Sequence, residues 1–277
     1  MSQFRTIEIS DSRFEYNNLR FMTVKTPNLR GRGDICVFVP PNIQADQIVP
    51  VVILLHGVYG SAWSWTHNAG LHLQAMEMIQ RGEIPQMIIA MPSDGLWGDG
   101  SAYLPHNNFN FEKWIAEDVV TALTEKIAGV TKDSPLFIAG LSMGGYGALR
   151  IGAKYGYRFR GISGHSSITS LEQMTLFAEE DLVNYYQDNK VDEDVFETIK
   201  KYGNNLPPIR FDCGSSDQLL EYNRMLHRQM NEHGIDHIYK EYPGAHEWSY
   251  WEKHIGESLR FFAEQLVKMS LSENNNV

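Results

Sequence analysis

The stretch IAGLSMGGYG, residues 138–147, surrounds Ser142 with four glycines and constrains the fold more than any other part of the chain. Its centre, residues 140–144, has the pattern G-x-S-x-G and lies between an apolar run and an amphipathic one. In a tight turn from a strand into a helix, larger side chains at the two glycine positions would collide with neighbouring backbone. Such a turn lifts the serine hydroxyl to the carboxyl edge of a parallel sheet, so the stretch predicts an α/β architecture with Ser142 as a nucleophile.

The rest of the chain alternates short apolar strands with amphipathic helices. Buried strands are expected at residues 48–57, 86–92, 134–140, 160–167, 207–217 and 235–244, and helices at 69–82, 111–130, 143–156, 218–234 and 248–269. The first forty residues instead alternate polar and apolar side chains, which is typical of antiparallel strands joined by turns. The sequence therefore predicts a mainly parallel, twisted sheet with helices on both faces and antiparallel N-terminal strands.

One stretch interrupts this alternation. Residues 168–205 are acidic and helical in pattern and contain no strand-like run, so we interpret them as an excursion between two strands that forms a small cap. The polar residues from about 270 onward predict a disordered tail. No repeat or change of composition marks a linker, and residues 1–277 are therefore expected to form a single domain.

Composition disfavours several classes of partner. The chain carries a formal net charge of −10, with 24 basic and 34 acidic side chains and no basic cluster, which argues against nucleic acid and anionic membranes. No stretch is apolar enough to span a bilayer, and the N-terminus lacks a signal-peptide pattern. Cys36 and Cys213 lie in apolar strands and are expected to be buried free thiols. We therefore expect a cytoplasmic protein, with assembly into a homo-oligomer left open.

A serine nucleophile needs a base and an acid, and chain order narrows the choice of both. In the expected architecture the acid and then the histidine follow the serine, on loops after later strands. Asp217 and His246 occupy these two positions. His165, at the end of a strand, is the rival base, and Asp212, inside a strand, is the rival acid. We predict Asp217 and His246, because the loops at strand ends carry catalysis in open α/β sheets.

Acyl transfer also needs two hydrogen-bond donors for the oxyanion. The N–H of Met143, at the start of a helix, is predicted to be one donor. The second should come from the loop after an early strand, where the sequence is LLHGVYGS, residues 54–61. We predict the N–H of Val58, with the N–H of Tyr59 as the alternative.

Aromatic and polar side chains on the expected loops predict a substrate pocket around Ser142. Its predicted lining comprises Tyr59, Trp97, Tyr103, His165 and Trp248. The loop DGLWGDGSAY, residues 94–103, lacks the spacing of a phosphate-binding loop, so no nucleotide is expected. His67 and His72 have no third ligand nearby, so no metal site is expected either.

The combination of LLHGVYGS, GLSMGGYGAL, CGSSD and GAHEWSYW resembles the esterase D-like branch of the α/β-hydrolases over residues 20–268. That branch includes S-formylglutathione hydrolases, feruloyl esterases, short-chain acyl esterases and the mycolyltransferases of the antigen 85 group. The resemblance implies the α/β-hydrolase fold and the hydrolysis of carboxylic esters without a cofactor. By position it also implies a catalytic triad of Ser142, Asp217 and His246.

The resemblance leaves several activities open. We expect a serine esterase for small acyl or aromatic esters, of acetyl or feruloyl type and including carbohydrate-linked ones. An acyltransferase would use the same site and differ only in the acceptor. S-formylglutathione hydrolases usually carry a cysteine in the loop that here reads HGVYGS, which argues against that thioesterase role. A binding protein that kept the fold without activity is disfavoured by the presence of Ser142, Asp217 and His246.

Overall fold

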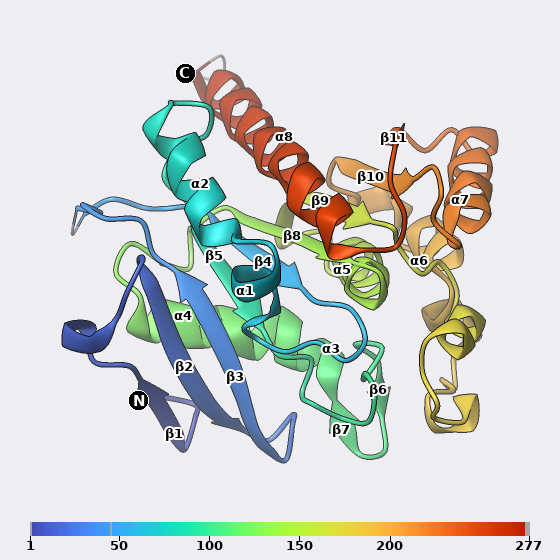
Figure 1. Cartoon of the computed structure of the whole chain (residues 1–277), viewed down its shortest axis with the longest axis horizontal. Helices are drawn as coiled ribbons and strands as arrows, with labels where there is room; N and C mark the ends of the chain where they lie inside the picture. The colour runs from blue at the N-terminus through green and yellow to red at the C-terminus, as the bar shows by residue number, and fades with distance from the viewer. Residues whose placement is uncertain (1, 45, 275–277) are drawn as a thin grey trace.

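A central sheet organises the computed structural model, which describes residues 2–44 and 46–274 (Figure 1). Within these residues it has nine strands, in the spatial order β1 (Thr6–Ile9), β2 (Leu19–Thr26), β3 (Gly31–Phe38), β5 (Ile88–Pro92), β4 (Val51–Leu55), β8 (Leu136–Leu141), β9 (Phe159–His165), β10 (Ile209–Gly214) and β11 (Ile238–Tyr242). Neighbouring pairs from β1 to β5 are antiparallel, and those from β5 to β11 are parallel. This arrangement confirms the predicted mainly parallel sheet with antiparallel N-terminal strands.

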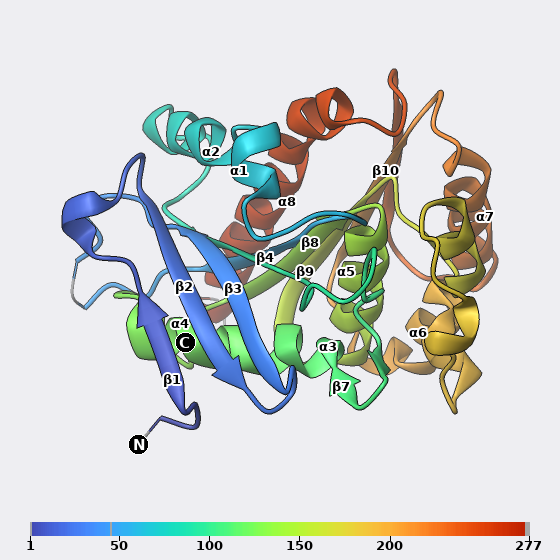
Figure 2. The same ribbon diagram turned by 60° about the horizontal axis from the view of Figure 1, so that its bottom comes forward.

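Helices cover both faces of the sheet, as Figure 2 shows. One layer contains α1 (Ser64–Asn68), α2 (Leu71–Gln80) and α8 (Trp248–Asn274), and the other contains α3 (Phe111–Lys113), α4 (Val120–Lys126), α5 (Met143–Lys154), α6 (Val195–Lys201) and α7 (Leu220–Glu232). Successive strand side chains point to opposite faces. In β4, Ile53 and Leu55 therefore pack into the core under α5, whereas Leu54 packs into the core under α2 and α8.

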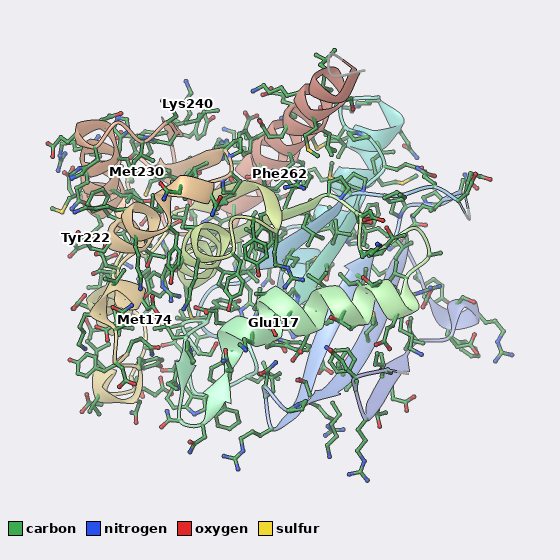
Figure 3. The ribbon with its side chains drawn as sticks, turned by 180° about the vertical axis from the view of Figure 1, so that it is seen from behind. Glu117, Met174, Tyr222, Met230, Lys240 and Phe262 are labelled. Carbon is green, nitrogen blue, oxygen red and sulfur yellow. The ribbon has the colours of Figure 1, made fainter. Side chains whose placement is uncertain are left out.

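The predicted single helix at residues 111–130 is interrupted by a wider turn. Residues Trp114–Val119 form a π-helical segment between α3 and α4. Its Trp114 indole donates a hydrogen bond to the Ser93 carbonyl (2.7 Å), and its buried Asp118 accepts one from Asn28 (2.9 Å). Figure 3 shows this helical stretch, marked by Glu117, crossing the back of the sheet. The spacing of apolar residues predicts a helix here but not the wider turn, because it carries no information on the contacts with Ser93 and Asn28.

The excursion at 168–205 consists mainly of four short 3₁₀ helices, Leu171–Leu176, Leu182–Asn184, Lys190–Glu193 and Gly203–Asn205. The α-helix α6 lies between the third and the fourth of them. Figure 3 shows Met174 of this excursion on the same flank as Met230 of α7. The predicted disordered tail is wrong up to Asn274, because α8 continues to that residue. Residues 275–277 of the predicted tail lie outside the described residues. The polar composition was misleading because a helix already nucleated over its earlier turns can add polar residues at little cost.

The two cysteines are free and buried, as predicted. Burial raises the pKa of the Cys36 thiol to about 12, so this group stays protonated near neutral pH. Across the part of the chain that the structure describes, no helix combines the length and the apolar character needed to cross a membrane.

Replacing Gly33 tests the packing of β3 against the π-helical segment. A Cβ at Gly33 would lie 2.5 Å from the Trp114 ring and 2.7 Å from Leu29, so Gly33→Ala forces a fully packed site to open. We expect a loss of about 1–3 kcal/mol in the free energy of unfolding, measured by urea denaturation. Gly31→Ala in the same strand is the matched control, because its Cβ would be 3.4 Å from the nearest atom. Equal stabilities of the two variants would contradict this account.

Candidate active site

Ser142 lies between β8 and α5 in a backbone conformation that side-chain-bearing residues rarely adopt, with φ 52° and ψ −121°. Gly144 permits the turn, because a Cβ there would lie 2.5 Å from the carbonyl oxygens of Leu55 and His56 at the end of β4. A Cβ at Gly140 would collide with the backbone of Gly144. Both glycines therefore make room for the turn, as the sequence pattern predicted.

The other two glycines of this stretch face side chains of neighbouring loops. A Cβ at Gly147 would lie 2.7 Å from the ring of Tyr103, and one at Gly145 would collide with Ser167. These glycines therefore admit loop side chains against the helix, which local sequence does not reveal.

Three side chains from separate loops form one chain of hydrogen bonds. The Nε2 atom of His246 lies 2.9 Å from the Ser142 hydroxyl, and its Nδ1 atom lies 2.9 and 3.1 Å from the two carboxylate oxygens of Asp217. The Asp217 side chain is fully buried, whereas the His246 side chain keeps 15% of its surface exposed. This geometry suits a hydroxyl that loses its proton to a histidine oriented by a carboxylate.

Two backbone segments lie beside the serine. Met143 is the first residue of α5, where N–H groups lack partners within the helix and can bind negative charge. Gly57 approaches the serine closely, since its Cβ would lie 3.3 Å from that of Ser142. Val58 follows directly. The Tyr59 N–H instead donates to the Asp99 carbonyl (2.7 Å), which removes the alternative to Val58.

The structure corrects the prediction that His165 lines a pocket. This histidine is fully buried, with Nδ1 3.1 Å from an Asp212 oxygen and Nε2 2.7 Å from the Ser258 hydroxyl. Asp212 also accepts hydrogen bonds from Arg210 (2.5 Å) and from the Tyr250 hydroxyl (2.7 Å). The His165 carbonyl accepts the Ser142 N–H (2.9 Å).

Tyr103 is also misplaced by the sequence prediction. It is fully buried, and its hydroxyl donates to the His56 carbonyl (3.0 Å), so it packs loops together and does not line a pocket. Trp97 and Trp248 are half-buried. Trp97 lies edge-on to Tyr185 with ring centroids 5.2 Å apart, and Trp248 lies edge-on to Trp65 at 5.6 Å.

Two aromatic side chains that the sequence did not single out contact His246. The ring of Phe177 stacks on the imidazole, with centroids 4.8 Å apart and an interplanar angle of 27°. The ring of Trp251 meets the imidazole edge-on, at 5.0 Å and 89°. The position of Trp251, in the first turn of the helix after His246, could have predicted its contact with the imidazole. Nothing local marks Phe177, because its contact joins segments far apart in the chain.

Comparison with known proteins identifies the family. The sequence model of the Esterase family, described as "Putative esterase", matches residues 27–262. The chain belongs to this esterase family. This chain is 28% identical over 229 residues to an acetyl esterase of Caldicellulosiruptor saccharolyticus. The match covers 76% of this chain and 82% of that relative. Its family makes it a carboxylesterase of the serine hydrolase class.

Solved structures share its fold. A ferulic acid esterase superposes with a TM-score of 0.77 at 20% identity, over 95% of this chain and 99% of that one. An S-formylglutathione hydrolase of Staphylococcus aureus gives a TM-score of 0.75 at 17% identity, over 92% of this chain and 99% of that one. These similarities establish the α/β-hydrolase fold of the esterase.

The buried charge network predicts a pH-dependent stability. Burial alone would raise the pKa of Asp212, but the charges of His165 and Arg210 and the Tyr250 hydrogen bond outweigh burial and lower it to about 2. The carboxylate therefore stabilises the folded protein above its unfolded pKa of 3.8, and this contribution is lost as the pH falls toward 2.

We expect Asp212→Asn to lower the free energy of unfolding by about 3 kcal/mol at pH 7, because it leaves a buried charge without its partner. The deficit relative to the unmodified protein should shrink when urea unfolding is repeated between pH 4 and pH 3. Asp133→Asn, at an exposed position, is the control and should change little. A deficit that grew on acidification would contradict the assigned role of Asp212.

Proposed function

We propose that this esterase hydrolyses small acyl and aromatic esters through an acyl-enzyme on Ser142. The observation that carries the proposal is the hydrogen-bond chain from Asp217 through His246 to the hydroxyl of Ser142, beside the start of α5. Each group has the partner that its role requires. Serine is a weak nucleophile without a base, and the base needs an acceptor at its second nitrogen.

The reaction proceeds in two matching halves. His246 Nε2 takes the hydroxyl proton while Ser142 Oγ bonds to the carbonyl carbon, and the resulting oxyanion accepts hydrogen bonds from the N–H groups of Met143 and Val58. The C–O bond to the alcohol then breaks, and His246 returns the proton to the leaving oxygen. Water then gives a proton to His246 as its oxygen bonds to the acyl carbon. The bond from that carbon to Ser142 Oγ breaks, His246 returns the proton to Oγ, and the acid leaves. Asp217 holds the Nδ1–H throughout and stabilises the imidazolium.

Relatives point to the substrate class. The curated relative is an acetyl esterase, and the structural neighbours include ferulic acid esterases. Acetyl and feruloyl esters, free or linked to carbohydrate, are therefore the substrates that we propose. An S-formylglutathione hydrolase is also among the structural neighbours, so S-formylglutathione belongs in the same assay.

Removing the nucleophile tests the proposal. We expect Ser142→Ala to lower kcat/KM for 4-nitrophenyl acetate by at least about 1000-fold, with the fold unchanged by circular dichroism. A fluorophosphonate probe should label the unmodified protein and not this variant. Ser12→Ala, at an exposed position outside the site, is the control for handling and purity. Full hydrolysis by Ser142→Ala would refute the mechanism.

The acyl preference is tested with a series of esters that share one alcohol. We expect 4-nitrophenyl acetate to be cleaved with a higher kcat/KM than the octanoate, because little of the nucleophile is accessible: only 2% of Ser142 is exposed. Methyl ferulate and acetylated xylan extend the series to aromatic and carbohydrate-linked esters. Faster turnover of S-formylglutathione than of every oxygen ester would replace this substrate assignment and keep the mechanism.

A further inference from the structure

A short segment of the excursion, residues 177–180, crosses the site, and we call it the strap. Its first residue, Phe177, is the side chain that stacks on the imidazole of His246, at 4.8 Å. The strap follows the 3₁₀ helix Leu171–Leu176, whose Met174 is fully buried in the core shared with α5. One end of the strap is therefore fixed against the base.

Hydrogen bonds tie the same segment to the loops that carry Tyr59 and Asp99. The Tyr59 hydroxyl donates to the Phe177 carbonyl. The Glu179 N–H donates to the Asp99 carboxylate (2.8 Å), and the Asp99 N–H donates to the Glu180 carboxylate (2.8 Å). Tyr59 directly follows Val58, so the strap joins the predicted oxyanion loop to the base.

The reaction requires the carbonyl oxygen of the ester and its alcohol group to bind on different sides of Ser142. The carbonyl oxygen must point toward the N–H groups of Met143 and Val58, whereas the alcohol oxygen must lie at His246 Nε2 to receive its proton. A side chain that covers the imidazole is thus a neighbour of the alcohol group. Little of the two reacting groups is exposed there: 2% of Ser142 and 15% of the His246 side chain.

We propose that Phe177, held in place by Tyr59, forms a wall of the alcohol site and determines which alcohols fit. The wall favours slim alcohol groups, either primary alkyl or planar aryl, over those branched at a saturated carbon that bears the oxygen, so esters of primary carbohydrate hydroxyls should be cleaved faster than esters of secondary ones. The inference rests on the proposed function and adds the class of alcohol to it. Phe177 and Tyr59 are specificity-determining residues, and neither takes part in proton transfer.

The test compares alcohol selectivity with acyl selectivity in one variant. Alcohol selectivity is the ratio of kcat/KM for isopropyl acetate to that for n-propyl acetate. Acyl selectivity is the same ratio for n-propyl butyrate and n-propyl acetate. We expect Phe177→Ala to raise the first ratio at least about 5-fold, since one methyl group of fit is worth about tenfold or more, and to leave the second within about twofold.

Tyr59→Phe provides a milder variant, because it removes the hydroxyl that holds the strap and keeps the ring. It should shift the alcohol ratio in the same direction by a smaller factor. Phe14→Ala and Tyr16→Phe are the matched controls, since both residues are exposed near the antiparallel edge of the sheet, at 72% and 80%. They should change neither ratio. An unchanged alcohol ratio in both strap variants, or a shift in the acyl ratio alone, would overturn the proposal.

A second readout uses the reverse direction of the same step. An acceptor alcohol that attacks the acyl-enzyme must enter where the leaving alcohol departed. Transfer of acetyl from 4-nitrophenyl acetate to isopropanol, relative to n-propanol, should therefore rise in Phe177→Ala by a factor similar to that for hydrolysis. Loss of activity in Ser142→Ala together with unchanged ratios in Phe177→Ala would reject the alcohol wall alone. Activity retained in Ser142→Ala would reject the proposed function itself.

Discussion

The backbone of Ser142 is the constraint on which the rest of the site depends. A non-glycine residue at φ 52° is strained, and it stays there because its surroundings fix it from several directions. Its N–H donates to the His165 carbonyl in β9 (2.9 Å), and its carbonyl accepts N–H groups from Tyr146 (3.0 Å) and Ile168 (3.2 Å). The close approach of Gly144 to β4 completes the frame. The backbone of Ser142 is thus held by three neighbouring elements, and this fixes the place from which its hydroxyl points into the site.

The loops of Asp217 and His246 are held to each other in the same way. Backbone N–H groups of Ser215 and Ser216 donate to the carbonyls of Tyr242 (2.8 Å) and Gly244 (2.9 Å), which continues the pairing of β10 and β11 past their ends. The hydroxyl of Tyr250, in the first turn of α8, donates a hydrogen bond to the buried carboxylate of Asp212. The base therefore reaches the serine through a sheet extension and an anchored helix start, and both are fixed before any substrate binds.

The amino-acid sequence was sufficient to predict the parts of this arrangement that depend on neighbouring residues and on the order of the elements along the chain. The parallel sheet followed from the apolar runs, and the glycines around Ser142 predicted the turn, because both depend on neighbouring residues. The grouping of Ser142, Asp217 and His246 followed from their positions after β8, β10 and β11. His165 and Tyr103 were misassigned because burial depends on which distant groups cover a strand end, and Phe177 was missed for the same reason. The π-helical segment likewise depends on packing that no local pattern records, whereas the helical residues up to Asn274 follow from the propagation of α8.

The excursion is attached to the protein mainly through α5 and the loops. Its Asp192 and Glu193 carbonyls accept hydrogen bonds from Arg150 (2.5 Å) and Tyr146 (2.9 Å), whereas the groups that form the hydrogen-bond chain at Ser142 come from other segments. Among the contacts of the described residues, Phe177 is the ring through which this excursion stacks on His246. Such an attachment separates the residues that select the ester from those that carry out the chemistry. Substitutions in residues 177–180 can change which esters fit, while the strands that position the hydrogen-bond chain at Ser142 stay intact. The same separation makes the insertion the natural target for a library in directed evolution.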